Sequence, residues 1–307
     1  MRRRKGRAVD GVMLLDKPRG ITSQTAVSRV KALFGAAKAG HTGTLDPLAD
    51  GLLPVCLGEA TKFSQGLLDA DKAYRAVVRL GIRTTTGDLE GEVLEQRPVT
   101  ATPEAIRQAA ATFEGEILQV PPMYSALKRN GRPLYAYARA GEVVEREPRR
   151  VTIRRLAIVA IDLPEVTIDV ACSKGTYIRV LAEDLGAALG CGAALAGLTR
   201  TAVGDLVLAD AIGFSALEAT PAEAREECLR PLDALVTALP RLECSAEEAR
   251  RLSHGQVFRR VGLAGGGSRR AYGPDGTFLG MVEAAEDGRI VPVRLVSLRP
   301  DAGPENT

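Results

Sequence analysis

Apolar side chains recur with two different periods between residues 166 and 189. Residues 166–172 alternate apolar and polar side chains, which is typical of a strand with one buried face. Residues 178–189 place apolar side chains three or four positions apart, which predicts a helix with one apolar stripe. Residues 173–177 form a glycine-containing turn between them. A strand, a tight turn and a helix in this order can present functional side chains, or can be no more than a well-formed structural turn.

The same two patterns predict the other main elements. Strands are expected at residues 11–15, 52–58, 71–81 and 151–161. Helices are expected at residues 23–34, where Ser23 can serve as the cap, and at residues 103–113, where Thr102 and Pro103 mark the start. Residues 84–88 are expected to form a loop, and the prolines in residues 120–126 favour an extended chain.

Residues 38–51 contain three glycines, two threonines, His41, Asp46 and Asp50. Neither a helical nor a strand period runs through this stretch, so a loop is expected. Polar loops held by a rigid scaffold are a favoured place for function. Asp46 followed by Pro47 is also a common start of a helix, because the Asp side chain accepts hydrogen bonds from first-turn amides. In that interpretation His41 is an ordinary loop residue.

Composition limits the class of protein. A hydrophobic fraction of 45% and a charged fraction of 26% are those of a soluble globular chain, and 307 residues suffice for a large domain with or without a small one. No apolar run reaches the length of a membrane span, and no secretion signal is recognisable. The five cysteines are scattered and the two histidines lie far apart, so reduced thiols in a cytoplasmic protein without a zinc centre are expected.

Positive charge is concentrated in two segments. Residues 1–7 hold five basic residues and no acid, and residues 128–155 hold nine basic residues against three acidic ones. Tyr135 and Tyr137 lie among the arginines of the second segment. Aromatic rings interleaved with cations suit RNA, whose bases stack on rings while its phosphates meet guanidinium groups. The alternative is a solvated charged face without a partner.

The last part of the chain differs from the rest. Ser245 and Glu248 form the sequence of a capping box, which predicts a short helix that ends near Gly255. Hairpin signals follow at residues 265–267, 274–276 and 287–288. We therefore expect a compact β-rich domain at residues 240–300. Residues 1–10 are expected to be a basic tail and residues 301–307 a disordered one.

Residues 40–49, Gly-His-Thr-Gly-Thr-Leu-Asp-Pro-Leu-Ala, strongly resemble the catalytic motif of the TruB family, the bacterial tRNA pseudouridine-55 synthases. Further segments resemble the family's other motifs in the expected order, over nearly the whole chain: residues 17–23, 58–62, 71–74, 120–128, 173–179 and 198–200. One departure is Asp50, where Thr or Ser is more often expected. A second carboxylate one helical turn beyond Asp46 could raise the pKa of the latter by repulsion, so Asp50 is given no catalytic role.

The resemblance implies an α+β pseudouridine synthase fold, with a mixed, largely antiparallel central sheet flanked by helices. Residues 11–239 would form the catalytic domain, and residues at about 121–150 a basic RNA-binding insertion within it. Residues 240–300 would form a small RNA-binding domain that resembles a PUA domain.

The implied activity is isomerisation of the uridine at position 55, in the T loop of tRNA, to pseudouridine, with neither cofactor nor metal. Asp46 would act as nucleophile or as base, and sequence cannot choose between these routes. Arg179 would pair with Asp46, and Tyr74 would stack on the target base. Tyr177 and Leu198 would line the pocket, and His41 would help to hold the RNA loop.

The implied partner is the T stem-loop of tRNA, bound by a cytoplasmic monomer without a guide RNA or a membrane. Backbone contacts are expected from Lys17 and from residues of the insertion, namely Lys128, Arg129, Arg132, Arg146, Arg149 and Arg150. The main alternative is a non-catalytic tRNA-binding or tRNA-folding protein on the same scaffold. A third alternative is a guide-RNA-dependent relative, and a remote fourth is a glycosidase that uses Asp46 and Asp50 as an acid/base pair.

Overall fold

A computed structural model describes residues 6–263 and 265–297 of the chain. Its main feature is a ten-stranded sheet, in which the β1–β14 and β3–β12 pairs are parallel and the other pairs are antiparallel. In order across the sheet, the strands are β14 (Ile212–Gly213), β1 (Gly11–Lys17), β3 (Ala49–Leu57), β12 (Ala193–Val203), β4 (Lys72–Leu80), β11 (Glu165–Cys172), β10 (Arg149–Asp162) and β7 (Gly115–Gln119), with β2 (Ala39–His41) beside β3 and β13 (Leu206–Val207) beside β12.

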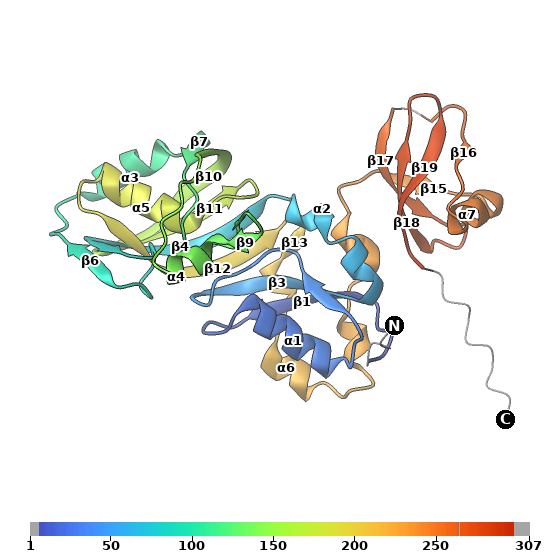
Figure 1. Ribbon diagram of the computed structural model, residues 1–307, viewed down its shortest axis with the longest axis horizontal. Coiled ribbons are helices and arrows are strands. Elements are labelled where there is room, and N and C mark those ends of the chain that lie inside the picture. The colour runs from blue at the N-terminus through green and yellow to red at the C-terminus, as the bar shows by residue number, and fades with distance from the viewer. Residues whose placement is uncertain (1–5, 264, 298–307) are drawn as a thin grey trace.

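Two groups of helices cover parts of this sheet (Figure 1). Helices α1 (Ser23–Leu33) and α6 (Phe214–Ala219) pack on β1 and β3, whereas α3 (Pro103–Ala111) and α5 (Ile178–Ala188) pack on the part formed by β4, β10, β11 and β12. Each group of helices covers a separate apolar core between itself and the sheet. Tyr74 and Leu198 contact both cores, so they lie at the seam between the two halves of the domain.

Several short elements connect the main ones. They are the 3-10 helices η1 (Gly58–Lys62), η2 (Leu208–Asp210), η3 (Arg225–Cys228) and η4 (Leu232–Leu235), the helices α2 (Gln65–Leu68) and α4 (Leu134–Arg139), and the strand pairs β5 (Ile82–Thr84) with β6 (Val93–Gln96) and β8 (Lys128–Arg129) with β9 (Arg132–Pro133). No helix in the described part of the chain is long and apolar enough to cross a membrane.

The helix starts test the cap predictions. Thr102 caps α3 by accepting a hydrogen bond from the Ala105 N–H, as predicted. The prediction that Ser23 caps α1 is wrong, because Thr22 accepts the bond from the Thr25 N–H instead and Ser23 is the first helical residue. The threonine occupies the extended backbone position that a cap requires.

The expected N-terminal tail is wrong where the structure describes it. Arg7 forms a bridge with Ala36, and Val9 is 2% exposed within the core under α1. Residues 1–5 of that expected tail lie outside the described residues, as do residues 298–307, which include the expected disordered tail.

The C-terminal part forms a second, five-stranded sheet, with strands in the order β15 (Arg241–Glu243), β17 (Gly267–Tyr272), β18 (Phe278–Ala284), β19 (Arg289–Leu295) and β16 (Phe258–Arg259), beside α7 (Ala246–Ser253). The predicted capping box of Ser245 and Glu248 is present at the start of α7. Turns at residues 274–276 and 287–288 join antiparallel neighbours as predicted. The expected hairpin at residues 265–267 is wrong, because β16 pairs with β19 rather than with β17.

The small sheet docks on the large domain through both apolar and polar contacts (Figure 1). The rings of Phe63 and Phe278 meet edge to face, with centroids 5.2 Å apart. The Tyr272 hydroxyl donates a hydrogen bond to Asp233 Oδ2 at 2.6 Å, and Lys62 Nζ donates to Ser297 Oγ at 2.8 Å. The two domains therefore share a packed interface.

Candidate active site

The polar stretch at residues 38–51 is shorter as a loop than expected. Residues 39–41 form β2 and residues 49–57 form β3, so the loop consists of residues 42–48, and Lys38 lies just before β2. Asp46 and Pro47 do not begin a helix; the Ala49 N–H donates to the Asp46 carbonyl at 3.1 Å and closes a turn. The loop ends where β2 and β3 pair with their neighbouring strands. The periodicity of the local sequence does not reveal this pairing.

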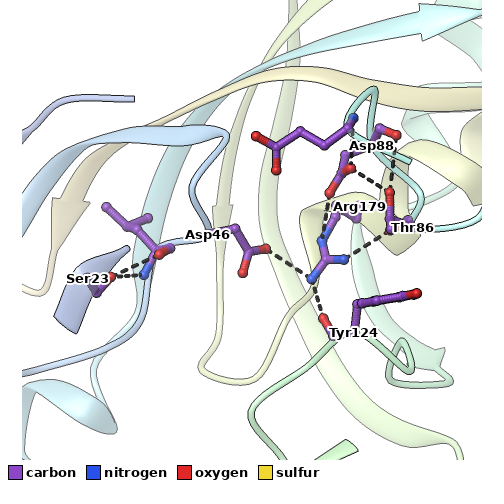
Figure 2. A network of polar contacts seen from close by, with 8 residues as sticks. Ser23, Asp46, Thr86, Asp88, Tyr124 and Arg179 are labelled. Carbon is purple, nitrogen blue, oxygen red and sulfur yellow. Dashed lines mark hydrogen bonds and ion pairs between the residues drawn. The ribbon is translucent and has the colours of Figure 1, made fainter. Parts of the chain in front are cut away.

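The turn at Asp46 is held in place from both sides. Ser23 is buried, and its hydroxyl accepts a hydrogen bond from the Leu45 N–H at 2.7 Å and donates one to the Leu45 carbonyl at 2.9 Å (Figure 2). On the other side, the Gly20 N–H donates to the Pro47 carbonyl at 2.8 Å. The residue before Asp46 and the residue after it are thus both fixed by backbone contacts.

Arg179 connects this loop to α5. Its Nη2 lies 3.0 Å from Asp46 Oδ2, and the same nitrogen donates to the Tyr124 carbonyl at 2.7 Å (Figure 2). Nη1 donates to the Thr86 carbonyl at 3.0 Å. The guanidinium side chain is 7% exposed, whereas the Asp46 side chain is 45% exposed. Asp46 is therefore oriented by a buried cation and remains open to a substrate.

Asp88 is a second acidic partner of this arginine. Its Oδ2 lies 3.8 Å from Arg179 Nε, and its side chain is 6% exposed. Thr86 Oγ1 donates to Asp88 Oδ1 at 2.6 Å, and the Glu90 N–H donates to the same oxygen at 3.1 Å. Arg179 thus lies between two carboxylates, one buried and one accessible. Sequence reasoning marked residues 84–88 only as a loop, and nothing local indicated that Asp88 reaches Arg179.

Tyr74 and Leu198 lie beside Asp46 at the seam of the domain. Leu198 of β12 is in register with Ala49 of β3 and with Ala76 of β4, so it lies close to the end of the Asp46 loop. Burial raises the pKa of the Tyr74 phenol, which stays neutral at neutral pH. A neutral half-buried ring next to a leucine forms an apolar wall that a base can stack against.

Tyr177 precedes α5 and is held by a buried glutamine. Its N–H donates to Gln119 Oε1 at 3.0 Å, and Gln119 Nε2 donates to its carbonyl at 3.3 Å. Burial raises the pKa of the Tyr177 phenol. The glutamine, which sequence reasoning did not single out, fixes the backbone directly before the helix that carries Arg179.

His41 ends β2 and contacts the loop that follows. The Gly43 N–H donates to its Nδ1 at 3.2 Å. Burial, and then the positive charge of Arg200, lower the pKa of the imidazole below its ordinary value. A neutral ring that accepts at Nδ1 carries its proton on Nε2. His41 is therefore a hydrogen-bond donor at Nε2.

Three family models match consecutive parts of this chain. They are "TruB family pseudouridylate synthase (N terminal domain)" at residues 31–178, "tRNA pseudouridylate synthase B C-terminal domain" at residues 179–237, and "Pseudouridine synthase II TruB, C-terminal" at residues 240–296. The chain belongs to the TruB family. The resemblance of its motifs to that family is thereby confirmed.

Proteins with similar sequences support the assignment of this chain to the TruB family. The chain is 57% identical over 296 residues to "tRNA pseudouridine synthase B" of Burkholderia mallei (strain NCTC 10247), an alignment that covers 94% of this chain and 98% of that protein. It is 58% identical over 301 residues to the protein of the same name from Ralstonia nicotianae (strain ATCC BAA-1114 / GMI1000), with 95% and 96% covered.

The fold matches a solved structure titled "Crystal Structure of a Cbf5-Nop10-Gar1 Complex", with a TM-score of 0.72, 27% sequence identity and coverage of 94% of this chain and 84% of that one. The predicted pseudouridine synthase fold, with its mixed and largely antiparallel sheet, is therefore confirmed.

One predicted RNA contact of the TruB-family site is wrong. Lys17 is fully buried, and its Nζ donates to the carbonyls of Pro18 at 2.9 Å and Ile21 at 2.8 Å. The side chain therefore stabilises the turn after β1 and does not reach a phosphate. The reason is its position: Lys17 is the last residue of β1, a strand in which every residue except Asp16 is buried.

Asp50 also differs from expectation. It lies within β3, in register with Thr199 of β12, and not one helical turn beyond Asp46. Its charge contributes, after burial, to the raised pKa of Asp16. The acidic neighbour of Asp50 is therefore Asp16 on the adjacent part of the sheet.

The cations expected to contact RNA in this TruB-family chain fall into two groups. Lys128 and Arg149 are exposed. The others have partners within the protein: Arg129 donates to the Glu145 carbonyl, Arg132 pairs with Glu142 at 3.0 Å, Arg146 donates to the Pro121 carbonyl at 3.0 Å, and Arg150 pairs with Glu116. Arg132 also stacks on the Tyr137 ring at 4.3 Å. These arginines hold the insertion together as well as carrying charge.

All five cysteines are free thiols, and burial raises the pKa of Cys56 to about 12 and that of Cys172 to about 11. Among the described residues, no group of three His, Cys, Asp or Glu side chains could hold a metal ion.

Proposed function

We propose that this chain converts the uridine at position 55, in the T loop of tRNA, to pseudouridine, and that Asp46 acts on the target nucleotide. The observation that carries the proposal is the pair of Asp46 and Arg179, 3.0 Å apart, in which the cation is buried and the carboxylate is accessible. The family membership and the names of the relatives support the reaction.

The reaction breaks the bond between N1 of uracil and C1′ of ribose, and then forms a bond between C5 and the same sugar. It is an isomerisation: C5 loses a proton to a base or to solvent and N1 gains one, so the substrate and the product contain the same atoms. Asp46 either attacks the sugar as a nucleophile or removes a sugar proton. Both roles need a carboxylate held at a fixed angle, and the Arg179 fork provides this orientation.

The target base must leave its stack to reach Asp46, which costs a few kcal/mol. The Tyr74 ring and the Leu198 side chain offer an apolar wall that returns part of this free energy when the base stacks on it. Tyr177 closes the pocket on the side of α5. The Nε2–H of His41 donates to the RNA loop from the opposite side.

We further propose that tRNA is held at two places outside the pocket. The insertion at about residues 121–150 contacts the backbone of the T stem through Lys128 and Arg149, with Arg129, Arg132 and Arg150 as further cations. The domain at residues 240–300, which we propose is PUA-like, contributes backbone contacts of its own. The protein acts as a cytoplasmic monomer without a guide RNA.

The test is incubation of purified protein with an unmodified tRNA transcript, without guide RNA or cofactor, followed by chemical mapping of pseudouridine. Pseudouridine at position 55 is expected. Tight tRNA binding without any pseudouridine would favour a non-catalytic tRNA-binding protein instead. Modification that requires an added guide RNA would contradict the stand-alone activity.

A further inference from the structure

Arg200 lies beneath the proposed active site and is almost completely enclosed. Its side chain is 1% exposed, and it is the largest fully buried side chain of the described residues. Its backbone lies in β12, in register with Gly51 of β3 and with Tyr74 of β4. A guanidinium is strongly hydrated, so burial is unfavourable unless its N–H groups find partners.

The partners of Arg200 are parts of the proposed active site. Its Nε donates to the Leu52 carbonyl at 2.8 Å, and its Nη2 donates to the Gly43 carbonyl at 3.1 Å. Gly43 belongs to the loop of residues 42–48 that carries Asp46. The two arms of one planar group therefore connect β3 with this loop, and a rigid fork fixes both acceptors relative to each other.

Tyr74 is a third neighbour of the guanidinium. Residues directly opposite on antiparallel strands place their side chains on the same face, which brings Arg200 and Tyr74 together. Burial lowers the pKa of Arg200, and the nearby Tyr74 phenol opposes this effect. The ring that would stack on the target base therefore lies beside Arg200, on the same face of the sheet.

Close packing also constrains the chain around Arg200. Gly51 has a φ of +90°, and a Cβ at this position would lie 2.5 Å from the Arg200 carbonyl oxygen. β3 can pass this close to Arg200 only because residue 51 is glycine. The backbone of Arg200 is thereby held close to the start of β3, while its side chain contacts the Asp46 loop.

We propose that Arg200 is a positioning residue for the reaction, which sets the Asp46 loop and the Tyr74 ring in a fixed relation to each other. Arg200 touches neither the RNA nor the reacting atoms and acts through Gly43 and Tyr74. This inference rests on the function proposed above. It gives a role to the third residue of the segment 198–200, of which only Leu198 was expected to act.

The test compares Arg200→Met and Arg200→Lys with a control, Arg225→Met. Arg225 likewise donates to backbone carbonyls, those of Leu33 at 2.9 Å and Thr220 at 3.1 Å, but it does so behind α1. The first readout is the single-turnover rate of pseudouridine formation at saturating T stem-loop RNA. The second is the ring titration of His41 followed by NMR, with His254, the other histidine of the chain, as internal reference.

Arg200→Met is expected to lower the single-turnover rate by about 100-fold, as misplacement of catalytic groups by about 1 Å can do. RNA affinity should change little, because Arg200 is enclosed. The pKa of His41 should rise, since the positive charge of Arg200 contributes to its lowering. Arg200→Lys keeps the charge and loses the fork, so it should leave the pKa of His41 low and lower the rate by about tenfold.

Wild-type turnover in Arg200→Met, or in Arg200→Lys if the methionine variant does not fold, would overturn the proposal. The proposal would also be overturned by two results together. The loss of rate would match the fraction of unfolded protein, as in Arg225→Met, and the titration of His41 would be the same as in wild type. If the wild-type protein itself forms no pseudouridine, the proposed function fails. The His41 titration would still report whether Arg200 controls this site.

Discussion

Asp46 Oδ2 and Arg179 Nη2 lie 3.0 Å apart across the seam of the domain, and the two side chains differ sharply in exposure, at 45% and 7%. Arg179 also contacts the Thr86 and Tyr124 carbonyls and faces Asp88. One buried side chain thus joins the Asp46 loop, the loop before β6 and the base of the basic insertion. The orientation of Asp46 depends on all three segments.

Arg179→Lys should remove most of the activity while RNA still binds. A lysine has a single compact ammonium, which cannot satisfy Asp46, Asp88 and two carbonyls that surround a planar fork. We expect kcat to fall by about 100-fold, in line with the effect of a misplaced catalytic group. Steady-state kinetics and RNA binding measure this, with Arg75→Lys, at an exposed pair with Asp169, as the control. Unchanged kcat would show that the fork is not needed.

Arg19→Met should loosen the Asp46 loop without unfolding the protein. Arg19 is exposed, and it donates from Nε to the Leu48 carbonyl at 2.9 Å and from Nη2 to the Ala196 carbonyl at 3.0 Å, so it ties the loop to β12. Exposed hydrogen bonds contribute about 1 kcal/mol to stability, so thermal unfolding should change little. We expect kcat/KM to fall by about tenfold. Wild-type kcat/KM would mean that the loop holds its position without Arg19.

The His41 imidazole should make stability fall on mild acidification. Its pKa in the folded protein lies below the ordinary value of 6.5, so the unfolded chain binds more protons between these two values. The free energy of unfolding therefore decreases as pH falls through this window. Denaturant unfolding should show wild type losing more stability than His41→Gln between about pH 7.5 and about pH 5, with His254→Gln as control. Equal losses in wild type and His41→Gln would be incompatible with a lowered pKa.

The double variant Lys128→Gln/Arg149→Gln should weaken tRNA binding and reduce its dependence on salt. Both side chains are exposed on the insertion. Each lost phosphate contact lowers the slope of log K against log salt by about one. Arg75→Gln, which removes an exposed cation already paired with Asp169, should leave the slope unchanged. A double variant with the wild-type slope would exclude these two residues as backbone contacts.

Sequence patterns predicted the elements whose signals are local. The alternation at residues 166–172, the cap at Thr102 and the capping box of Ser245 and Glu248 all appear in the structure. Each of these depends on side chains within a few positions of one another. Their physical cause therefore lies within the segment itself.

Long-range contacts account for what the patterns did not predict. Lys17 was expected at an RNA phosphate, but β1 carries it into the interior, where it binds carbonyls. Ser23 was expected to cap a helix and holds Leu45 instead. The position of Asp88 beside Arg179 results from the folding of three distant segments onto one another. No period or local composition records such a contact.

The most direct test of the central claim is single-turnover modification of tRNA by Asp46→Asn. The amide has nearly the shape of the carboxylate but is a poor nucleophile and base, so pseudouridine formation at position 55 should be abolished. The binding constant for tRNA should stay within about threefold of wild type, a difference below 1 kcal/mol. Pseudouridine formation by Asp46→Asn at the wild-type rate would contradict the role proposed for Asp46.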